Sequence, residues 1–376
     1  MEEIDVLIIG AGPAGVSTAM HLLQSDPLWS GRMVIIEKAV HPRDKLCGGG
    51  LTQLSFIVLQ SLGINLPLSI PGVEINDVRL AFRGRTIHVR GKREFVVYHR
   101  PEFDAYLVKE ARGRGIEIRE GETVLDLLFD ENCVLVKTDQ NTYQAKVVVG
   151  ADGSKGITRR VFNPSDPNRC VARLLGLRGN GESQAKHFSE NYALLDFSPV
   201  VENLQGYYWE FPCRIDGKDF INYGVYDSRI YSSRKLASLR EIFTRNLISQ
   251  KIDPDQVQIE GHPIHLFTPR NPMSCPHLIL VGDAIGAEPI LGEGIAPALA
   301  CGKIASEAIT EAFIGNEFSF ANYRGKILSS TIGGFLTERW MIAKFLYRFI
   351  RSPLIMHGFW TLGTFVEKTI LRQSLP

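Results

Sequence analysis

The chain contains 376 residues, of which 44% are hydrophobic and 22% are charged, a composition typical of folded globular proteins. A chain of this length exceeds one compact core and predicts about two domains. The 42 basic and 41 acidic side chains almost cancel, which excludes the strongly basic surface of a nucleic-acid-binding protein.

The cysteines and the hydropathy pattern indicate the compartment. Six cysteines occur without a C-x-x-C pair, so we expect free thiols in a reducing environment, and we predict no metal site. No apolar stretch approaches the roughly 18 residues of a membrane-spanning helix. A strand is expected almost at the first residue, where a signal peptide would need a charged segment and a short apolar run. We therefore expect a cytoplasmic protein.

The first expected elements are a buried strand over residues 4–9, a glycine turn and a helix. The turn over residues 10–15 reads GAGPAG, which fits the G-x-G-x-x-G pattern of dinucleotide sites. Its glycines permit a tight turn, close approach of a pyrophosphate, and close packing of the helix on the strand. We expect this turn to bind the cofactor through Gly10, Gly12, Ala14 and Gly15. A second strand over residues 33–36 ends at Glu37, whose carboxylate can accept hydrogen bonds from ribose hydroxyls.

Three further segments follow before the middle of the chain. Residues 43–50 read RDKLCGGG, in which glycines after Cys47 let the backbone approach a planar ring closely. The neighbouring basic side chains would favour a thiolate; the alternative is a small buried thiol filling a glycine turn. Residues 79–90 alternate apolar and polar side chains, which predicts a β-excursion. Arg100 opens a helix.

An aromatic segment is the main feature of the second half. Residues 207–212 read YYWEFP, and on a strand Tyr207, Trp209 and Phe211 would point to one face. They could line a tunnel for an apolar chain or stabilise positive charge on an alkene carbon; the alternative is an aromatic stripe packed in a sheet core. Another strand is expected over residues 220–226 and a helix over residues 236–243.

Two strands frame the remaining cofactor signals. One strand, over residues 146–149, runs into the Asp152-Gly153 turn, and another, over residues 277–281, ends in Gly282-Asp283. Residues 289–295 read PILGEGI and lead into a helix rich in small residues. The backbone N–H groups of Gly294 and Ile295 would stabilise negative charge at this helix start. Glu293 is expected to orient the turn.

These segments together favour FAD over NAD. An extended FAD must be held along its ribityl chain by distant strands, and no second glycine fingerprint of similar quality occurs. The segments resemble the glutathione-reductase-like flavoproteins of the hydroxylase type. Residues 45–50 (KLCGGG), 207–212 and 289–295 are more specific, because they resemble signatures of the geranylgeranyl reductase family. Leu204 stands where that family's aromatic signature begins with proline.

The resemblance implies roles for particular residues. It places Asp283 on the ribityl chain, Arg100 along the flavin, and the loop of Cys47 and Gly48 beside the isoalloxazine ring; we also expect Val124 to contact the cofactor. Cys47, Tyr207 and Trp209 are the predicted catalytic residues. The family pattern expects serine where this chain has Gly156, which weakens a hydroxylase-like use of NADPH.

The predicted fold class is α/β (α+β overall), with a Rossmann-like FAD-binding domain, a β-sheet substrate domain and a helical C-terminal region. We expect the FAD-binding domain to be discontinuous, over residues 1–75, 95–165 and 262–315. Residues 76–94 and 166–261 would form the β-rich substrate domain, and residues 316–376 the helical region. The helical region combines aromatic and basic residues, which suits either a cap on the cavity or a bilayer interface. These residues are Trp340, Lys344, Phe345, Tyr347, Arg348, Phe349, Arg351, Phe359 and Trp360.

The leading functional prediction is an FAD-dependent oxidoreductase of isoprenoid lipid metabolism. It would reduce carbon–carbon double bonds of a prenyl (geranylgeranyl-type) chain by hydride transfer from reduced flavin N5. The alternatives are an NADPH-dependent monooxygenase and an electron-transfer flavoprotein that reduces a quinone. The expected electron donor is NADPH or a ferredoxin-like protein. The expected partners are a prenyl compound or lipid and, as an open alternative, a membrane surface that the protein contacts peripherally.

Overall fold

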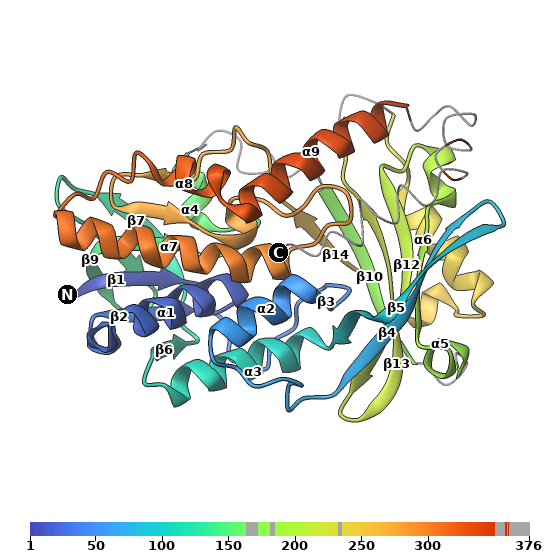
Figure 1. Ribbon diagram of the computed structural model, residues 1–376, viewed down its shortest axis with the longest axis horizontal. Coiled ribbons are helices and arrows are strands. Elements are labelled where there is room, and N and C mark those ends of the chain that lie inside the picture. Colours follow the sequence, from blue (N-terminus) through green and yellow to red (C-terminus); the bar gives the residue numbers. More distant parts are fainter. Residues whose placement is uncertain (163–171, 181–184, 232–234, 350–357, 359, 361–376) are drawn as a thin grey trace.

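The computed structural model describes residues 1–162, 172–180, 185–231, 235–349, 358 and 360, arranged around two eight-stranded sheets. Figure 1 shows the first sheet and its helices in one half of the molecule and the second sheet in the other half. Helix α9 (Thr331–Phe349) extends from the first half toward the second (Figure 1). The predicted mixed α/β fold class is confirmed.

The first sheet has a parallel core and an antiparallel arm. Its strand order is β15-β16-β9-β1-β2-β6, and β8 joins β9 to the outer strand β7. Val6–Ile9 and the whole of Met33–Glu37 are buried, as expected for parallel strands covered on both faces. The strands are β1 (Glu2–Ile9), β2 (Met33–Glu37), β6 (Glu117–Glu120), β7 (Val124–Phe129), β8 (Val134–Thr138), β9 (Thr142–Gly150), β15 (Ser274–Cys275) and β16 (Leu278–Leu280).

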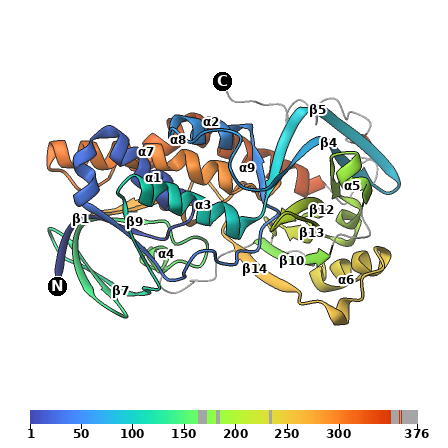
Figure 2. The ribbon, with the colours of Figure 1, turned by 90° about the horizontal axis from the view of Figure 1, so that it is seen from below.

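Helices pack closely on the first sheet. Figure 2 shows α1, α3 and α7 on one side of the parallel strands β1 and β9 and the antiparallel arm with β7 on the other side. A Cβ added at Gly302 would lie 2.5 Å from Ser17 Oγ, and Ser17 Oγ donates to Leu299 O at 2.7 Å. The small residues of α7 therefore allow close contact with α1. The helices, besides α9, are α1 (Pro13–Ser25), α2 (Gln53–Ser61), α3 (Arg100–Gly113), α4 (Ile157–Arg160), α5 (Ala185–Ser189), α6 (Leu239–Ser249), α7 (Ile295–Gly315) and α8 (Tyr323–Ser329).

The second sheet is mainly antiparallel, with the order β14-β10-β13-β12-β11-β4-β5-β3. In its centre, Tyr207 pairs with Tyr226, Trp209 with Gly224 and Phe211 with Asn222. These three pairs lie on one face, because side chains alternate along each strand. The strands are β3 (Gly50–Thr52), β4 (Gly72–Phe82), β5 (Arg85–Tyr98), β10 (Ala172–Asn180), β11 (Tyr192–Asp196), β12 (Gly206–Ile215), β13 (Lys218–Asp227) and β14 (Glu260–Ile264).

The parallel strands position the site at one edge of the first sheet. Strands β1, β2, β9 and β16 end at Ile9, Glu37, Gly150 and Leu280, and the register aligns Ile9 with both Ile36 and Gly150. Loops that leave neighbouring parallel strands at their carboxyl ends meet in one crevice, where open α/β sheets bind their ligands. The glycine turn, the Asp152 turn and the Asp283 turn therefore converge there.

The expected local elements are confirmed with two differences. The strands over residues 4–9 and 33–36 and the helix opened by Arg100 form as predicted. The helix expected over residues 236–243 begins only at Leu239, because the Ser238 hydroxyl caps it by accepting the N–H of Glu241. The alternation over residues 79–90 belongs to a longer hairpin, β4 and β5.

Some predictions stay open. Strands β4 and β5 run across the domain limits expected near residues 75 and 94, so the division into domains stays a prediction. Cys170, Arg351 and Phe359 lie outside the described residues. Within the described part of the chain, no helix is both long and apolar enough to cross a membrane.

Candidate functional site

A cavity of about 920 Å³ lies between the carboxyl edge of the first sheet and one face of the second sheet. Tyr207 and Trp209, the aromatic side chains predicted to be catalytic, line it. Gly15 is the single residue predicted to bind the cofactor that does not line the cavity. The lining includes the remaining ones, which are Gly10, Gly12, Ala14, Glu37, Cys47, Gly48, Arg100, Val124, Asp283, Gly294 and Ile295.

The glycine turn fits a dinucleotide. Gly10 has φ +109°, and a Cβ there would lie 2.5 Å from Ala151 O; at Gly15 a Cβ would lie 2.0 Å from Gly10 O. These two glycines therefore serve the tight packing of the turn itself. At Gly12, in contrast, the nearest atom to an added Cβ is a guanidinium nitrogen of Arg43 at 3.6 Å. Gly12 thus leaves a cradle beside a cation and the first turn of α1, which suits the pyrophosphate of FAD.

Glu37 holds the turn as well as facing the cavity. Its carboxylate accepts the N–H of Ala11 at 2.9 Å and the N–H of Ala39 at 3.0 Å. Arg43 Nε lies 3.8 Å from the same carboxylate. The buried carboxylate at the end of β2 is therefore fixed in place, and its position matches the ribose-binding acid of dinucleotide sites.

A buried ion cluster adjoins the glycine turn and Glu37 through Arg43. Arg100 donates to Asp104 through Nε and one terminal nitrogen, both at 3.0 Å, and Arg43 lies 3.3 Å from Asp104. Burial alone would lower the pKa of Arg100, but Asp104 and Cys47 outweigh burial and raise it. For Asp104, burial opposes ionisation, and the cations nevertheless lower its pKa. Arg100 is thus a fixed cation in the wall of the cavity.

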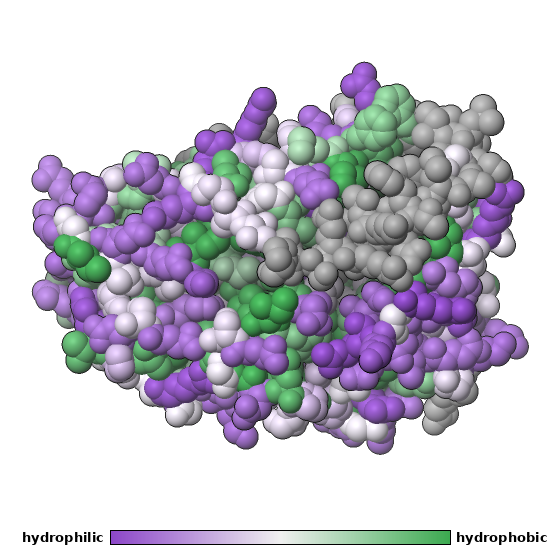
Figure 3. Space-filling view, in the orientation of Figure 1, coloured by the Kyte–Doolittle hydropathy of each residue, from purple (hydrophilic) through white to green (hydrophobic). Residues whose placement is uncertain are grey.

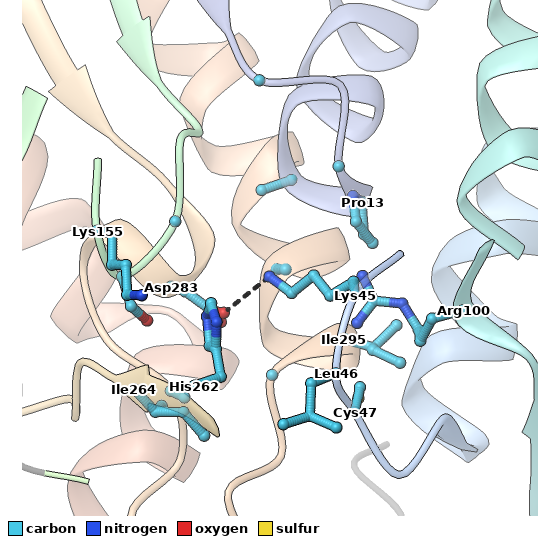
Figure 4. Close-up of a pocket in the computed structure, with 18 of the residues that line it drawn as sticks. Pro13, Lys45, Leu46, Cys47, Arg100, Lys155, His262, Ile264, Asp283 and Ile295 are labelled. Atoms are coloured by element: carbon cyan, nitrogen blue, oxygen red, sulfur yellow. Dashed lines mark ion pairs between the residues drawn. The ribbon is translucent and has the colours of Figure 1, made fainter. Parts of the chain in front are cut away.

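Figure 4 shows Arg100 and Lys45 reaching the cavity from opposite sides of the loop that carries Cys47. Lys45 Nζ lies 3.6 Å from Asp283, the residue expected on the ribityl chain. Our sequence analysis assigned the positive environment of Cys47 to Arg43 and Lys45. Both of these cations pair with carboxylates, and the cation that is coupled electrostatically to Cys47 is Arg100.

The glycines after Cys47 are required by the second sheet. Gly49 has φ +77°, and a Cβ there would lie 2.2 Å from Tyr98 O. A Cβ on Gly48 would lie 3.0 Å from the Phe211 ring. The loop is therefore pressed against the sheet, with the N–H of Gly49 donating to Cys47 Sγ at 3.4 Å. This packing leaves the other side of the loop to the cavity.

Asn222 is a site residue that the sequence analysis missed. Its amide donates to Cys47 O at 2.7 Å and accepts the indole N–H of Trp209 at 3.1 Å. Trp209 lies over Gly224, where a Cβ would come within 2.0 Å of the indole. Trp209 therefore positions Asn222, which in turn anchors the Cys47 loop. The signal in the sequence is a polar residue and a glycine on the same face of an apolar strand.

Three buried tyrosines hold the loop that precedes α7. Tyr207 donates to Leu291 O, Tyr226 to Pro289 O at 3.1 Å and Tyr347 to Ile290 O at 3.3 Å. Burial raises the pKa of all three hydroxyls, so they keep their protons as donors. We call residues 288–294 the flavin loop. The tyrosines come from β12, β13 and α9, so the second sheet and the C-terminal helix both fix this loop.

The flavin loop also contains two buried carboxyl groups. Glu288 accepts the N–H groups of Ile290 at 2.6 Å and Leu291 at 2.7 Å, which closes the loop on itself. Glu293 lines the cavity and accepts the hydroxyl proton of Thr52 at 2.6 Å. The sequence analysis assigned Glu293 the orientation of the turn, but the residue that binds the turn's N–H groups is Glu288.

The Asp152 turn explains the departure at residue 156. Asp152 accepts the N–H and hydroxyl groups of Thr158 at 3.0 and 2.7 Å. A Cβ on Gly156 would lie 2.0 Å from the Asp152 carboxyl group. A serine at this position, as in the hydroxylase pattern, would therefore displace Asp152. This loop is built around the glycine.

Comparisons with known proteins agree with the cofactor site. Residues 3–165 match the family of FAD-binding domains. Menaquinone reductase from Mycolicibacterium smegmatis is 27% identical, over 81% of this chain and 76% of the relative. Digeranylgeranylglycerophospholipid reductase 3 from Methanosphaera stadtmanae is 26% identical, over 85% of this chain and 80% of the relative.

The fold has a solved counterpart. A geranylgeranyl bacteriochlorophyll reductase-like protein from Thermoplasma acidophilum has a TM-score of 0.73 at 21% identity, over 92% of this chain and 88% of that chain. The FAD-binding domain and the cradle that fits FAD make the chain an FAD-dependent oxidoreductase. Its relatives include proteins named as digeranylgeranylglycerophospholipid reductases, which agrees with the resemblance found in its sequence.

Proposed function

We propose that this oxidoreductase reduces carbon–carbon double bonds in a polyprenyl chain. The observation that supports the proposal best is the continuity of the cavity from the cofactor cradle to an apolar wall on the second sheet. A long ligand without polar groups would bind such a wall by burial of apolar surface. The wall includes Val78, Phe95, Leu195, Tyr207, Trp209, Phe211 and Ile264.

The relatives supply a second line of support. Menaquinone and digeranylgeranylglycerophospholipid, which appear in the names of two relatives, have different head groups. Both molecules contain a polyprenyl chain. The polyprenyl chain is thus the part that these two molecules share and the part that fits an apolar wall.

The proposed roles follow from the contacts. Bound FAD supplies the hydride for such a reduction. Cys47 lies in the loop that we place beside the flavin ring. Its sulfur accepts the N–H of Gly49 and is coupled electrostatically to Arg100, so we assign it the role of tuning the ring. The rings of Tyr207 and Trp209, with centroids 6.1 Å apart, present aromatic faces that would shelter positive charge on an alkene carbon.

The test is an anaerobic single turnover. The purified holoprotein is reduced with dithionite, mixed with geranylgeranyl diphosphate or with menaquinone, and followed by product mass and flavin absorbance. We expect the mass of the prenyl chain to rise by two hydrogens per reduced bond as the flavin is reoxidised. NADPH and reduced ferredoxin are then compared as donors. A flavin that stays reduced with every polyprenyl compound would refute the proposal.

The runner-up is a monooxygenase of the hydroxylase type. The glycine-built loop at Gly156 and the Cys47 loop argue against it, since the hydroxylase pattern has a serine that this structure does not accommodate. Substrate-dependent oxygen consumption with a hydroxylated product would favour this alternative. Reduction of the quinone ring, with the prenyl chain unchanged in mass, would instead favour the electron-transfer alternative.

A further inference from the structure

We propose that Glu293 is the proton donor of the reaction, held in place by Thr52. This inference rests on the proposed function, because reduction of an unpolarised double bond needs a proton donor placed beside the flavin. Glu293 directly precedes Gly294 and the start of α7, and it lines the cavity together with Thr52, Cys47 and Tyr207. It is therefore an acidic side chain at the junction of the cofactor cradle and the apolar wall.

The hydrogen bonds give Glu293 the geometry of an acid. Thr52 donates to Glu293 Oε1 at 2.6 Å, which assigns that oxygen the acceptor role. In a protonated carboxyl group, the second oxygen then has its proton available for another acceptor. Thr52 stands at the end of β3, directly after the glycine loop, so the strand that follows Cys47 also orients Glu293.

The charges around the flavin loop favour the proton on Glu293 over Glu288. Two backbone N–H groups bind the Glu288 carboxylate, and Arg339 from α9 adds an opposing charge. The Glu293 carboxyl group accepts a hydrogen bond from the Thr52 hydroxyl. The negative charge of Glu288 disfavours its ionisation, and the positive charge of Arg339 favours it. Burial raises the pKa of both groups, and Glu288 raises that of Glu293 further. When two coupled carboxyl groups lie beside one cation, the group that accepts fewer hydrogen bonds keeps the proton, and here that group is Glu293.

The neighbouring groups leave this task to Glu293. The Cys47 sulfur accepts the N–H of Gly49 at 3.4 Å. The Tyr207 hydroxyl donates a hydrogen bond to Leu291 O, and burial raises the pKa of that hydroxyl. Both contacts engage the polar atoms of these side chains inside the protein. Glu293 lines the cavity, and its hydrogen bond with Thr52 engages only Oε1, as an acceptor.

The step balances. One alkene carbon receives a hydride from the reduced flavin, and the other carbon receives the proton of Glu293. Two C–H bonds form, the π bond and the carboxyl O–H bond break, the flavin is oxidised by two electrons, and Glu293 becomes a carboxylate. Water restores the proton before the next turnover.

The test compares Glu293→Gln with Glu307→Gln, a control carboxylate exposed on α7. We expect E293Q to bind FAD and to slow the single turnover by about 100-fold or more, as for loss of a general acid. Infrared difference spectra at neutral pH should show the carbonyl band of a protonated carboxyl group in the wild type and in E307Q, and its loss in E293Q. A wild type without this Glu293-dependent band would overturn the inference.

A second variant, Thr52→Val, tests the inference if E293Q does not fold. The wild-type rate should fall as pH rises through the pKa of Glu293, because the carboxylate has no proton to give. The Thr52 hydroxyl lowers that pKa, so Thr52→Val should move the falling limb to higher pH. A limb that does not move would overturn the inference. If the wild type reduces no polyprenyl compound, the proposed function fails, while the infrared band still reports the state of Glu293.

Discussion

Asn222 links the aromatic face of the second sheet to the Cys47 loop, and its replacement by aspartate tests that link. In Asn222→Asp, an oxygen replaces the nitrogen that lies 2.7 Å from Cys47 O, while the bond from Trp209 is kept. A buried carbonyl left without its donor costs about 1–3 kcal/mol. Two oxygens in contact add repulsion, so we expect the cost at the upper end of this range.

The cost should appear in FAD affinity as well as in stability, because the displaced loop lines the cofactor cavity. If half or more of the cost falls on binding, the dissociation constant of FAD rises about tenfold, since 1.4 kcal/mol is a factor of ten. The effect should diminish at low pH, where a protonated aspartate can donate to Cys47 O. Urea unfolding and flavin fluorescence titration measure the two quantities.

Asn246→Asp is the matched control. The Asn246 amide also donates to a backbone carbonyl, Ile242 O at 2.8 Å, but it does so within α6, on a helix that does not line the cavity. N246D should lose stability by about 1 kcal/mol and leave FAD affinity unchanged. If N222D shifts FAD affinity no more than N246D, the proposed anchoring of the Cys47 loop is wrong.

Three further outcomes are expected. Gly156→Ser should lower the free energy of unfolding by about 1–3 kcal/mol, because the added side chain would meet Asp152. Gly31→Ser, where nothing lies near an added Cβ, should leave the stability unchanged, so equal melting curves for the two variants would contradict this prediction. Burial, and then Arg159, lower the pKa of His265 from 6.5 to about 3, so between these pH values the unfolded chain binds a proton that the folded chain does not. The free energy of unfolding should therefore fall as pH falls from about 6.5 to about 3, and it should fall less steeply in His265→Gln. Met341, Phe345 and Phe349 are exposed on α9 beside Lys344 and Arg348, and apolar surface is visible over this helix in Figure 3. We predict that the protein cosediments with anionic vesicles, that this binding weakens as salt is added, and that the variant F345E/F349E does not bind; equal binding of the variant would refute membrane contact.

The cofactor half of the site could be predicted because its signals are local. The turn over residues 10–15, Glu37 and the Asp283 turn each follow a buried strand within a few residues. Parallel strands bring their carboxyl ends to one edge, so local patterns suffice to place these residues together. The aromatic face of β12 could be predicted for the same reason, since alternation along a strand is a property of neighbouring residues.

The contacts that organise the loops could not be predicted, because they join distant parts of the chain. Asn222 and Cys47 are 175 residues apart, and Thr52 and Glu293 are 241 residues apart. A polar residue in an apolar strand signals that a partner exists, but the pairing of the two sheets decides which carbonyl it meets. The pairing of Arg43 with Asp104 and of Lys45 with Asp283 could not be predicted for the same reason, since both are tertiary contacts.

The second sheet therefore has two functions that cannot be separated by truncating its aromatic residues. Tyr207 presents a ring to the cavity and its hydroxyl to the flavin loop; Trp209 presents an indole to the cavity and its N–H to Asn222. In the proposed function, a prenyl chain bound against these rings would press on the groups that hold the cofactor loops. Removal of a ring would alter the apolar wall and the cofactor cradle together, whereas Tyr207→Phe removes only the hydroxyl. If the proposed function is correct, these contacts would couple substrate fit to flavin position through Leu291 and Cys47.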